Sequence, residues 1–425
     1  MRQVRLYAGA RRNAPVLPGM RDALFQRELN GDIDMIDFEY YAPTKIFFGR
    51  GAQEKTGLLV REFGGTNVLV HYSGTAERLG LLDDVKAQLD GLGIRHTELG
   101  GVQPNPRLAK VYEGVELCRE RGVDFILAIG GGSVIDSAKA IGVGAADEGD
   151  VKDFYLRKRT PQRSLPVATI LTFAAAGSEM SMSTVITDEH RKMPLDNDIC
   201  RPVFSIMNPA LTYTLPPYQT ASGIVDIMMH TLDRYFTPTE RPMEITDEIS
   251  EGLLRTVIRN AAVVMRKPDD YDARAEIMWA GALSHNGLTG CGQATDFAPH
   301  MLQHELGGMF DSAHGAGIAA VWGSWARHVY KTNPRRFAKI AVNVLGVQAG
   351  ADDEQTALAG ICAMEDFFRS IGMPTSIAEL EGFTLTDEQI DALARACVSR
   401  SPGGTIGAFQ TLHLADVRAI YTAAR

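Results

Sequence analysis

The 425-residue chain is poor in cysteine and in positive charge, and it has no long hydrophobic run. Its five cysteines lie far apart without CxxC spacing, so we expect no disulfide framework and a reducing compartment, the cytoplasm. With a net charge of −9, the chain lacks the basic character that a nucleic-acid partner would need. No run of eighteen apolar residues occurs, which excludes a transmembrane helix, and the basic N-terminus lacks the apolar stretch of a secretory signal.

The pattern of apolar residues divides the chain into three parts. Residues 1–35 show no clear periodicity and are expected to form an N-terminal extension. From 36 to about 214, strand-like and helix-like segments alternate, which predicts a mostly parallel sheet covered on both faces, an α/β domain of the nucleotide-binding type. From 215 to 425 the apolar residues recur at helical spacing, which predicts an all-α domain.

Three apolar runs of the α/β part indicate buried strands. They are VLVHY (68–72), DFILAIGGG (124–132) and LPVATILTF (165–173). The amphipathic stretch TAERLGLLDDVKAQLDGLG (75–93) after the first run predicts one helix.

Four residues of the all-α part have the types and spacing of a divalent-metal site. Asp226 and His230 are four apart in GIVDIMMHTLDRYF, so on a helix they share one face. His300 and His304 repeat that spacing, and His314 follows after a predicted turn. One carboxylate with the imidazoles of residues 230, 300 and 314 suits Fe²⁺ or Zn²⁺ better than Ca²⁺ or Mg²⁺. The spacing alone leaves open ordinary histidines on a helix face.

A glycine-rich turn joins a predicted strand to a predicted helix. Gly131, Gly132 and Ser133 would let a pyrophosphate approach the backbone at a helix N-terminus. Ile135 occupies the third glycine position of the usual dinucleotide fingerprint, so a tight structural turn is the alternative. Asp136 could accept a hydrogen bond from a ribose or nicotinamide group, or simply favour the first turn of the helix.

Several long motifs carry a family resemblance. They include DFILAIGGGSVIDSAKAI, AAGSEMS, SIMNPALTYTLPPYQTASGIVDIMMH and HMLQHELGGMFDSAHGAG. Over residues 36–425 the chain resembles the iron-containing alcohol dehydrogenase family, and within it the butanol dehydrogenase branch of NAD(P)-dependent aldehyde reductases. The resemblance implies a dehydroquinate synthase-like fold, with a Rossmann-like dinucleotide-binding domain, a helical metal-binding domain and the active site between them. It also implies hydride transfer between NAD(P)(H) and a primary alcohol or aldehyde such as butanol or butanal.

The resemblance assigns roles to individual residues. It implies that Asp226, His230, His300 and His314 hold the metal and that His304, beside it, could help proton transfer. The implied cofactor contacts are Asn105, Gly131, Gly132, Ser133, Asp136, Thr172 and Ser181.

The sequence departs from the family pattern at two cofactor positions. The second of two usual threonines before GSE is Ala176, so one hydroxyl contact is absent. The family's cofactor-binding lysine would fall near Pro194, and the nearest basic residue is Lys192.

The turn after the first strand bears on the choice between NADP and NAD. Members that prefer NAD usually carry an Asp there, whereas this chain reads Ser73-Gly74-Thr75, with no carboxylate before Glu77. Hydroxyl and backbone N–H groups can bind a 2′-phosphate that an acid would repel, which favours NADP over NAD, with Ser73 and Gly74 as contacts. The alternative is that Ser73 or Thr75 only caps the next helix.

Two other enzyme classes share the implied fold: a glycerol (polyol) dehydrogenase, and a dehydroquinate synthase-like cyclase that uses a metal and NAD. Both would place polyol- or phosphate-binding residues around the metal, whereas the segments here are apolar. Phe297, Met301 and Phe310 are candidates for the wall of an aldehyde pocket, with packing as the alternative for each. The resemblance also suggests a homodimer or a larger homo-oligomer.

Overall fold

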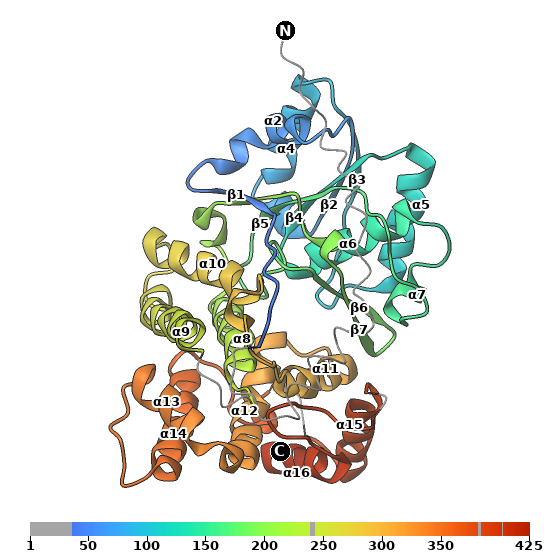
Figure 1. The fold of residues 1–425 in the computed structure, drawn as a ribbon. Coiled ribbons are helices and arrows are strands. Elements are labelled where there is room, and N and C mark those ends of the chain that lie inside the picture. The colour runs from blue at the N-terminus through green and yellow to red at the C-terminus, as the bar shows by residue number, and fades with distance from the viewer. Residues whose placement is uncertain (1–35, 239–242, 381–383, 402) are drawn as a thin grey trace.

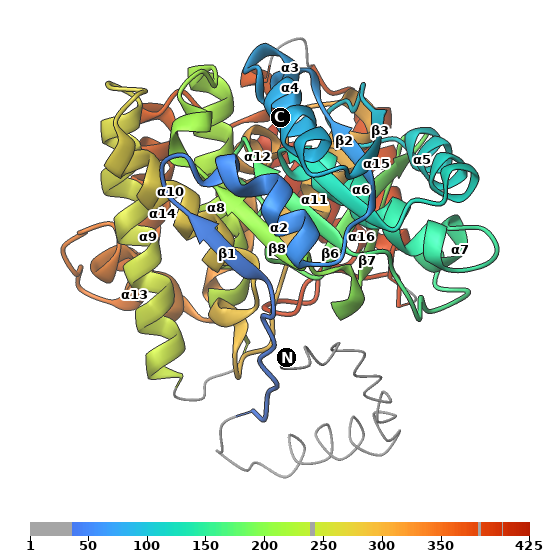
Figure 2. The same ribbon diagram turned by 90° about the horizontal axis from the view of Figure 1, so that it is seen from above.

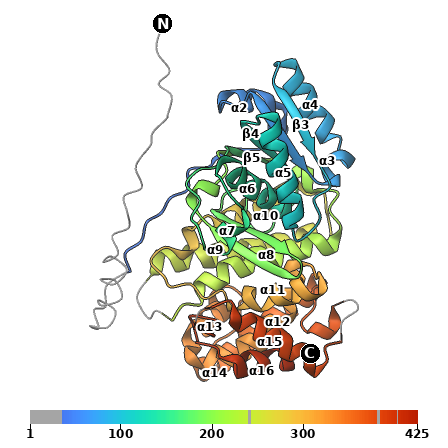
Figure 3. The ribbon, with the colours of Figure 1, turned by 90° about the vertical axis from the view of Figure 1, so that its right-hand side faces the viewer.

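The computed structural model of the protein describes residues 36–238, 243–380, 384–401 and 403–425 (Figure 1). A sheet with its covering helices forms one half, and helices form the other half, which lies beneath it in Figure 3. The extension predicted for residues 1–35 lies outside the described residues. No helix of the described ranges is both long and apolar enough to cross a membrane.

A six-stranded parallel sheet forms the first half. Its strands, in spatial order, are β1 (Lys45–Phe48), β8 (Phe204–Met207), β5 (Val167–Leu171), β4 (Phe125–Gly130), β2 (Asn67–Tyr72) and β3 (Arg95–Leu99). β1 and β3 therefore lie at opposite edges (Figure 2). From β2 the chain moves outward to β3 and then crosses to β4 on the other side of β2, so the strand order reverses between β2 and β4. At such a switch point the carboxyl ends of parallel strands form a ligand-binding crevice.

Helices cover both faces of the sheet, as the alternating pattern predicts. One face carries α2 (Thr56–Glu62), α3 (Gly74–Arg78) and α4 (Leu81–Gly91), and the other carries α5 (Leu108–Arg121), α6 (Gly132–Ala146) and α7 (Lys152–Tyr155). In Figure 1, α2 and α4 lie above the strands and α6 below them. Val68 and Val70 of β2 pack on the first face and Leu69 on the second, because successive strand residues point to opposite sides. The predicted fold class is confirmed.

The helix predicted over 75–93 is two helices, so that prediction was wrong. α3 ends at Arg78 and α4 begins at Leu81, with Gly80 between them at φ +67°. This left-handed conformation is accessible to glycine but interrupts a helix.

A hairpin that the sequence analysis did not assign lies outside the main sheet. Strands β6 (Ser183–Asp188) and β7 (Arg191–Asp196) pair in antiparallel fashion. β6 packs on α6 of the sheet half, and β7 packs on α11 (Ala298–Phe310) of the helical half, as Figure 1 shows. The hairpin therefore bridges the two halves.

The second half is helical, as predicted. Besides α11 it contains α8 (Pro217–Tyr235), α9 (Glu244–Val264), α10 (Tyr271–His285), α12 (His314–Val329), α13 (Pro334–Asn343), α14 (Asp353–Ser370), α15 (Asp387–Ser399) and α16 (Leu414–Ala424). Their apolar faces enclose one core that includes Phe236, Trp322 and Trp325. α8 is buried along almost its whole length and carries residues 226 and 230 of the candidate site.

Candidate active site

A deep cleft of about 1460 Å³ lies between the carboxyl edge of the sheet and the helical half. All fourteen metal, proton-transfer and cofactor candidates from the sequence line it: Ser73, Gly74, Asn105, Gly131, Gly132, Ser133, Asp136, Thr172, Ser181, Asp226, His230, His300, His304 and His314. Phe297 and Met301 line it too, whereas Phe310 packs against the helical core. The fold thus gathers into one cavity side chains that are scattered along the sequence.

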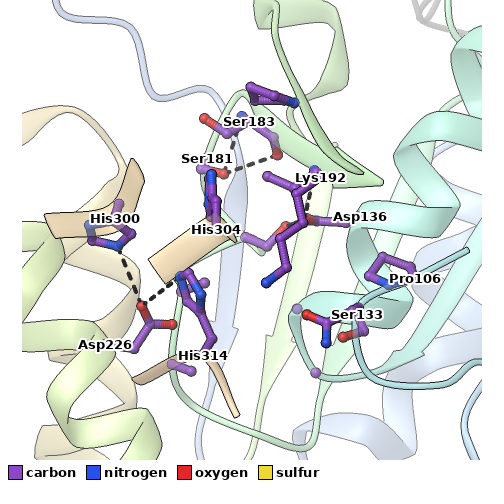
Figure 4. A pocket seen from close by; sticks show the side chains of 18 of the residues that line it. Pro106, Ser133, Asp136, Ser181, Ser183, Lys192, Asp226, His300, His304 and His314 are labelled. Carbon is purple, nitrogen blue, oxygen red and sulfur yellow. Dashed lines mark hydrogen bonds and ion pairs between the residues drawn. The ribbon is translucent and has the colours of Figure 1, made fainter. Parts of the chain in front are cut away.

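Four side chains converge at the helical wall of the cleft, and Figure 4 labels three of them, Asp226, His300 and His314. Asp226 and His230 come from α8, His300 from α11, and His314 is the first residue of α12. From Asp226 Oδ1, the Nε2 atom of His230 lies 3.5 Å away, and those of His300 and His314 each lie 3.6 Å away. The side chains of residues 226, 230 and 300 are almost fully buried.

The chemistry of these four side chains fits a divalent metal. Asp226 Oδ1, His230 Nε2 and His300 Nε2 are buried and have no hydrogen-bond partner among the described residues. Unpaired buried polar atoms cost several kcal/mol unless a ligand satisfies them. Ligand atoms at about 2.1 Å from a tetrahedral metal lie about 3.4 Å apart, close to the separations found here. One oxygen and three imidazole nitrogens match the preferences of Fe²⁺ and Zn²⁺.

Two of the three imidazoles are oriented through their second nitrogen. His300 Nδ1 donates to Asp233 Oδ2 at 2.6 Å, and His314 Nδ1 donates to Gln303 Oε1. These bonds turn each Nε2 lone pair toward Asp226. The sequence analysis missed Asp233 and Gln303, although each follows a site histidine by three residues, one helical turn.

His304 lies one turn after His300 on α11, and its ring stacks on that of His314 with centroids 5.7 Å apart. Burial, reinforced by the ammonium of Lys192, holds the pKa of His304 well below its usual range. The imidazole is therefore neutral and has one nitrogen to donate and one to accept a proton.

The sequence analysis also missed His285 at the end of α10. The centroid of its ring lies 4.0 Å from that of the His230 ring. The His300 ring also packs against His230, with centroids 4.3 Å apart. His285 Nδ1 donates to the carbonyl oxygen of Ala176 at 2.7 Å. His285 Nε2 lies 3.4 Å from Ser183 Oγ, so both ring nitrogens have partners and the ring packs beside the candidate metal site.

The glycine-rich turn faces the metal site across the cleft. Gly131 precedes α6, and Gly132 begins it, directly after β4 and beside the end of β2. A Cβ on Gly132 would meet only Ala176 Cβ, at 3.8 Å, so the turn is open toward the cleft. This position at the switch point gives the turn the place in which doubly wound folds bind a pyrophosphate.

Asp136 holds a protein segment rather than pointing freely into the cleft. Its Oδ1 accepts a hydrogen bond from Ser178 Oγ at 2.6 Å, and its Oδ2 accepts one from the backbone N–H of Val185 at 2.9 Å. A carboxylate oxygen can accept a second bond, so contact with a cofactor ribose stays a prediction. Lys139, one turn later and fully buried, donates to Ser178 Oγ and to the carbonyl oxygen of Ser183.

The Lys192 side chain enters the cleft from strand β7. Figure 4 shows its ammonium between His314 and Ser133, and it has no hydrogen-bond or ion-pair partner among those found in the described ranges. Burial lowers the pKa of Lys192 to about 8, although Asp226 acts in the opposite direction. Lys192 therefore supplies the cleft with a cation, whereas the sequence left open whether a lysine would lie there.

Asn105 connects the two walls of the cleft. Its amide donates to Asp311 Oδ1 at 2.6 Å, and Arg107 Nη2 donates to the same oxygen at 3.1 Å. Asp311 directly follows α11, so these bonds join the sheet half to the helical half.

The end of β2 leaves a hydroxyl group available. Ser73 precedes α3, yet its side chain makes no capping hydrogen bond. The alternative that Ser73 serves only as a helix cap is therefore wrong for this residue.

Comparison with known families agrees with this geometry. The family described as "Iron-containing alcohol dehydrogenase" matches residues 43–209, and the C-terminal model described as "Fe-containing alcohol dehydrogenase family" matches residues 220–425. The chain belongs to the iron-containing alcohol dehydrogenase family. The membership predicted from the sequence motifs is confirmed, and the chain is an oxidoreductase of the alcohol dehydrogenase type.

Named relatives are similar over nearly the whole chain. The probable NADH-dependent butanol dehydrogenase 1 of Bacillus subtilis is 38% identical over 392 residues, which cover 92% of this chain and 100% of that protein. The NADPH-dependent aldehyde reductase YqhD of Escherichia coli is 34% identical over 400 residues, with 92% and 100% covered. The crystal structure of NADH-dependent butanol dehydrogenase A from Thermotoga maritima superposes with a TM-score of 0.87 at 36% identity, covering 91% of this chain and 98% of that one.

Proposed function

We propose that the protein transfers a hydride reversibly between a nicotinamide cofactor and a primary alcohol or aldehyde such as butanol or butanal. The observation that carries the proposal is the convergence of three imidazole nitrogens on one oxygen of Asp226, opposite a glycine-rich turn in the same cleft. The relatives named butanol dehydrogenase and aldehyde reductase support the substrate class.

In this proposal Asp226, His230, His300 and His314 hold Fe²⁺ or Zn²⁺. When bound, the metal supplies Lewis acidity to the substrate oxygen, and the nicotinamide supplies or accepts the hydride. Both metals suit the donor set, and at equal availability the Irving–Williams order favours Zn²⁺.

The chain's own residues would orient the reactants and move the proton. Asp233 and Gln303 fix the rings of the metal ligands. His304, which lies in the cleft beside His314, would relay the proton: in the reductive direction one ring nitrogen would donate to the product oxygen while the other accepts a proton from water, and the oxidative direction would reverse both transfers. Lys192 would bind the cofactor, since its ammonium faces the glycine-rich turn.

Phe297 and Met301 would form the apolar wall against the substrate. The ring of Phe297 lies 5.5 Å from that of His300, centroid to centroid. Its backbone adopts φ +61°, a left-handed conformation that a bulky residue rarely takes and that often marks functional sites. These apolar side chains beside the ligands argue against the polyol dehydrogenase and cyclase alternatives.

The cofactor contacts proposed are Ser73, Gly74, Asn105, Gly131, Gly132, Ser133, Asp136, Thr172 and Ser181. Relatives that use NADH and relatives that use NADPH are both similar to this chain. We propose NADP(H) as the preferred cofactor, because Ser73 offers a free hydroxyl where an acid would select NAD.

We also propose a homodimer or a larger homo-oligomer. Support comes from exposed aromatic side chains on and before the edge strand β1, namely Phe38, Tyr40, Tyr41 and Phe48. The molar mass in solution, measured by light scattering, tests this point, and a monomer would contradict it.

A nicotinamide absorbance assay tests the function. The purified protein is stripped with a chelator, reloaded with Fe²⁺ or Zn²⁺, and given butanal with NADPH or NADH. We expect oxidation of the reduced cofactor that depends on the metal and is faster with NADPH. Bound metal and bound cofactor without turnover of any aldehyde or alcohol would contradict the proposal.

A further inference from the structure

The carboxyl end of β2 forms a distinct region of the cleft, away from the metal ligands. Ser73, Gly74, Thr75 and Arg78 all line the cleft there. β2 and the strand that leads into the glycine-rich turn, β4, are neighbours in the sheet. A dinucleotide whose pyrophosphate lies on that turn therefore places its adenosine ribose beside residues 73–78.

The guanidinium of Arg78 is held toward this region. Its Nη2 donates to Thr75 Oγ1 at 2.8 Å, and Arg78 makes no ion pair with a carboxylate within the described part of the chain. Its Nη1 lies 3.3 Å from the point where a Cβ on Gly74 would be. Gly74 has no side chain, so the guanidinium lies over bare backbone at the edge of the cleft.

Ser73 adds a second donor next to the guanidinium. The Ser73 hydroxyl makes no helix-capping bond. A hydroxyl beside a planar guanidinium is a donor set that suits a phosphate, because arginine can donate two parallel hydrogen bonds to phosphate oxygens.

We propose that Arg78, with Ser73, binds the 2′-phosphate of NADP(H) and thereby determines the preference for this cofactor. The inference rests on the proposed function, because it takes the cleft to be the dinucleotide site. Glu77 is the competing group: its Oε2 lies 3.7 Å from the same point above Gly74. The Glu77 carboxylate repels a 2′-phosphate, whereas it can accept a hydrogen bond from the 2′-hydroxyl of NAD(H). Of these two side chains only that of Arg78 lines the cleft, which favours the cofactor that carries the 2′-phosphate.

Binding measurements on the metal-loaded protein test the proposal without relying on turnover. Isothermal titration calorimetry compares NADP⁺ with NAD⁺, and 2′,5′-ADP with 5′-AMP, for the wild type, Arg78→Met and Glu77→Gln. We expect Arg78→Met to weaken binding of NADP⁺ and 2′,5′-ADP by at least about tenfold, since a charge-assisted hydrogen bond is lost. Binding of NAD⁺ and 5′-AMP should stay within about twofold of the wild type, because neither carries the phosphate. Glu77→Gln should tighten NADP⁺ binding.

Arg157→Met is the matched control. Arg157 also lines the cleft and is exposed, so its replacement removes the same charge from the cavity at another place. If Arg157→Met weakens NADP⁺ binding as much as Arg78→Met does, the effect is a general electrostatic attraction between the cleft and the cofactor, and the proposal is overturned. Equal weakening of NADP⁺ and NAD⁺ by Arg78→Met would also overturn it, as would a wild type that binds NAD⁺ more tightly than NADP⁺.

Failure of this inference and failure of the proposed function have different signatures. If Arg78→Met leaves NADP⁺ binding unchanged while the wild type reduces butanal, only the assignment of Arg78 fails. If the wild type binds both dinucleotides but turns over no alcohol or aldehyde, the reaction proposed above fails, while the binding comparison still decides the role of Arg78.

Discussion

Lys139 and Asp136 lie one turn apart on α6, and both hold the same neighbouring segment. The ammonium of Lys139 donates to the carbonyl oxygen of Ser183 at 2.8 Å, and Asp136 Oδ2 accepts from the backbone N–H of Val185 at 2.9 Å. α6 begins at the glycine-rich turn, so one helix fixes both the turn and the segment that carries the cleft residue Ser181. The two parts of the proposed cofactor site are therefore held by the same helix.

Replacing Lys139 with Met should damage both stability and catalysis. The change leaves the buried Asp136 without the nearby cation that favours its ionised form, and it removes the Lys139 hydrogen bonds to Ser178 and Ser183, where each buried acceptor left unpaired costs about 1–3 kcal/mol. We expect a lower free energy of unfolding in urea, a higher KM for the cofactor and a lower kcat. The double variant Lys139→Met/Asp136→Asn removes both charges and should recover most of the stability but not kcat. Recovery of kcat as well would show that the pair acts only through stability.

Replacing His304 with Ala should lower turnover while the metal stays bound. A general acid–base contributes about 100-fold to the rate, so kcat should fall by about that factor. Metal content, measured by mass spectrometry of the purified protein, should equal that of the wild type. His300→Ala, one turn earlier on the same helix, is the matched variant and should lose the metal. Loss of metal from His304→Ala would instead assign residue 304 to the ligand set.

Replacing Asp233 with Asn should weaken metal binding although Asp233 is not a proposed ligand. Its carboxylate fixes His300 by a 2.6 Å bond, and removing such a partner typically reduces metal affinity about 10- to 100-fold. Competition with a chromogenic zinc chelator measures the affinity. Glu305→Gln is a suitable control, because Glu305 lies on the same helix as His300 but bonds Arg400 instead. Unchanged metal affinity in Asp233→Asn would contradict the orienting role.

His71 should make the protein less stable in mild acid. Burial lowers the pKa of His71 to about 4, and the ring bonds the carbonyl oxygen of Leu99 and the hydroxyl of Ser137. Well above pH 6.5 the imidazole is neutral in both the folded and the unfolded state, and its full contribution to the free energy of unfolding is present. Between pH 6.5 and 4 the unfolded state binds a proton that the folded state excludes, so stability falls as the pH falls.

The size of this effect follows from the difference in pKa. Between pH 7.5 and pH 5 the wild type should lose about 2 kcal/mol more unfolding free energy than His71→Gln, which has no group that titrates at this position. Urea unfolding of both proteins after chelator treatment removes the contribution of acid-induced metal loss. If the unfolding free energies of the two proteins fall in parallel with pH, the acid effect does not come from His71.

Local spacing along one element could be read from the sequence. Asp226 and His230 share a face of α8 because helical geometry fixes residues four apart, and the turn at Gly132 follows from the strand and helix beside it. The break between α3 and α4 at Gly80 was not predicted, because a glycine within an apolar helical pattern can either continue the helix or break it.

Contacts between distant segments could not be read in this way. From the sequence Asp136 could contact the cofactor or simply favour the first turn of its helix, and neither reading predicted that its oxygens bond residues more than forty positions away. Lys192 belongs to a hairpin whose short strands alternate weakly, with residues of both polar and apolar type inside, so neither the strands nor the direction of the lysine was evident. The partner of a buried polar group depends on the tertiary packing. Residues nearby in the sequence do not indicate which distant segment will supply that partner.

The three imidazoles proposed as metal ligands are not held alike. Those of residues 300 and 314 are tethered by hydrogen bonds, whereas both ring nitrogens of His230 lack a partner among the described residues. The orientation of His230 is set instead by the rings of His285 and His300, which flank it. One of the proposed metal ligands is thus oriented by packing rather than by a hydrogen bond. Packing by His285, which is not a proposed ligand, therefore fixes the angle at which His230 would meet a metal.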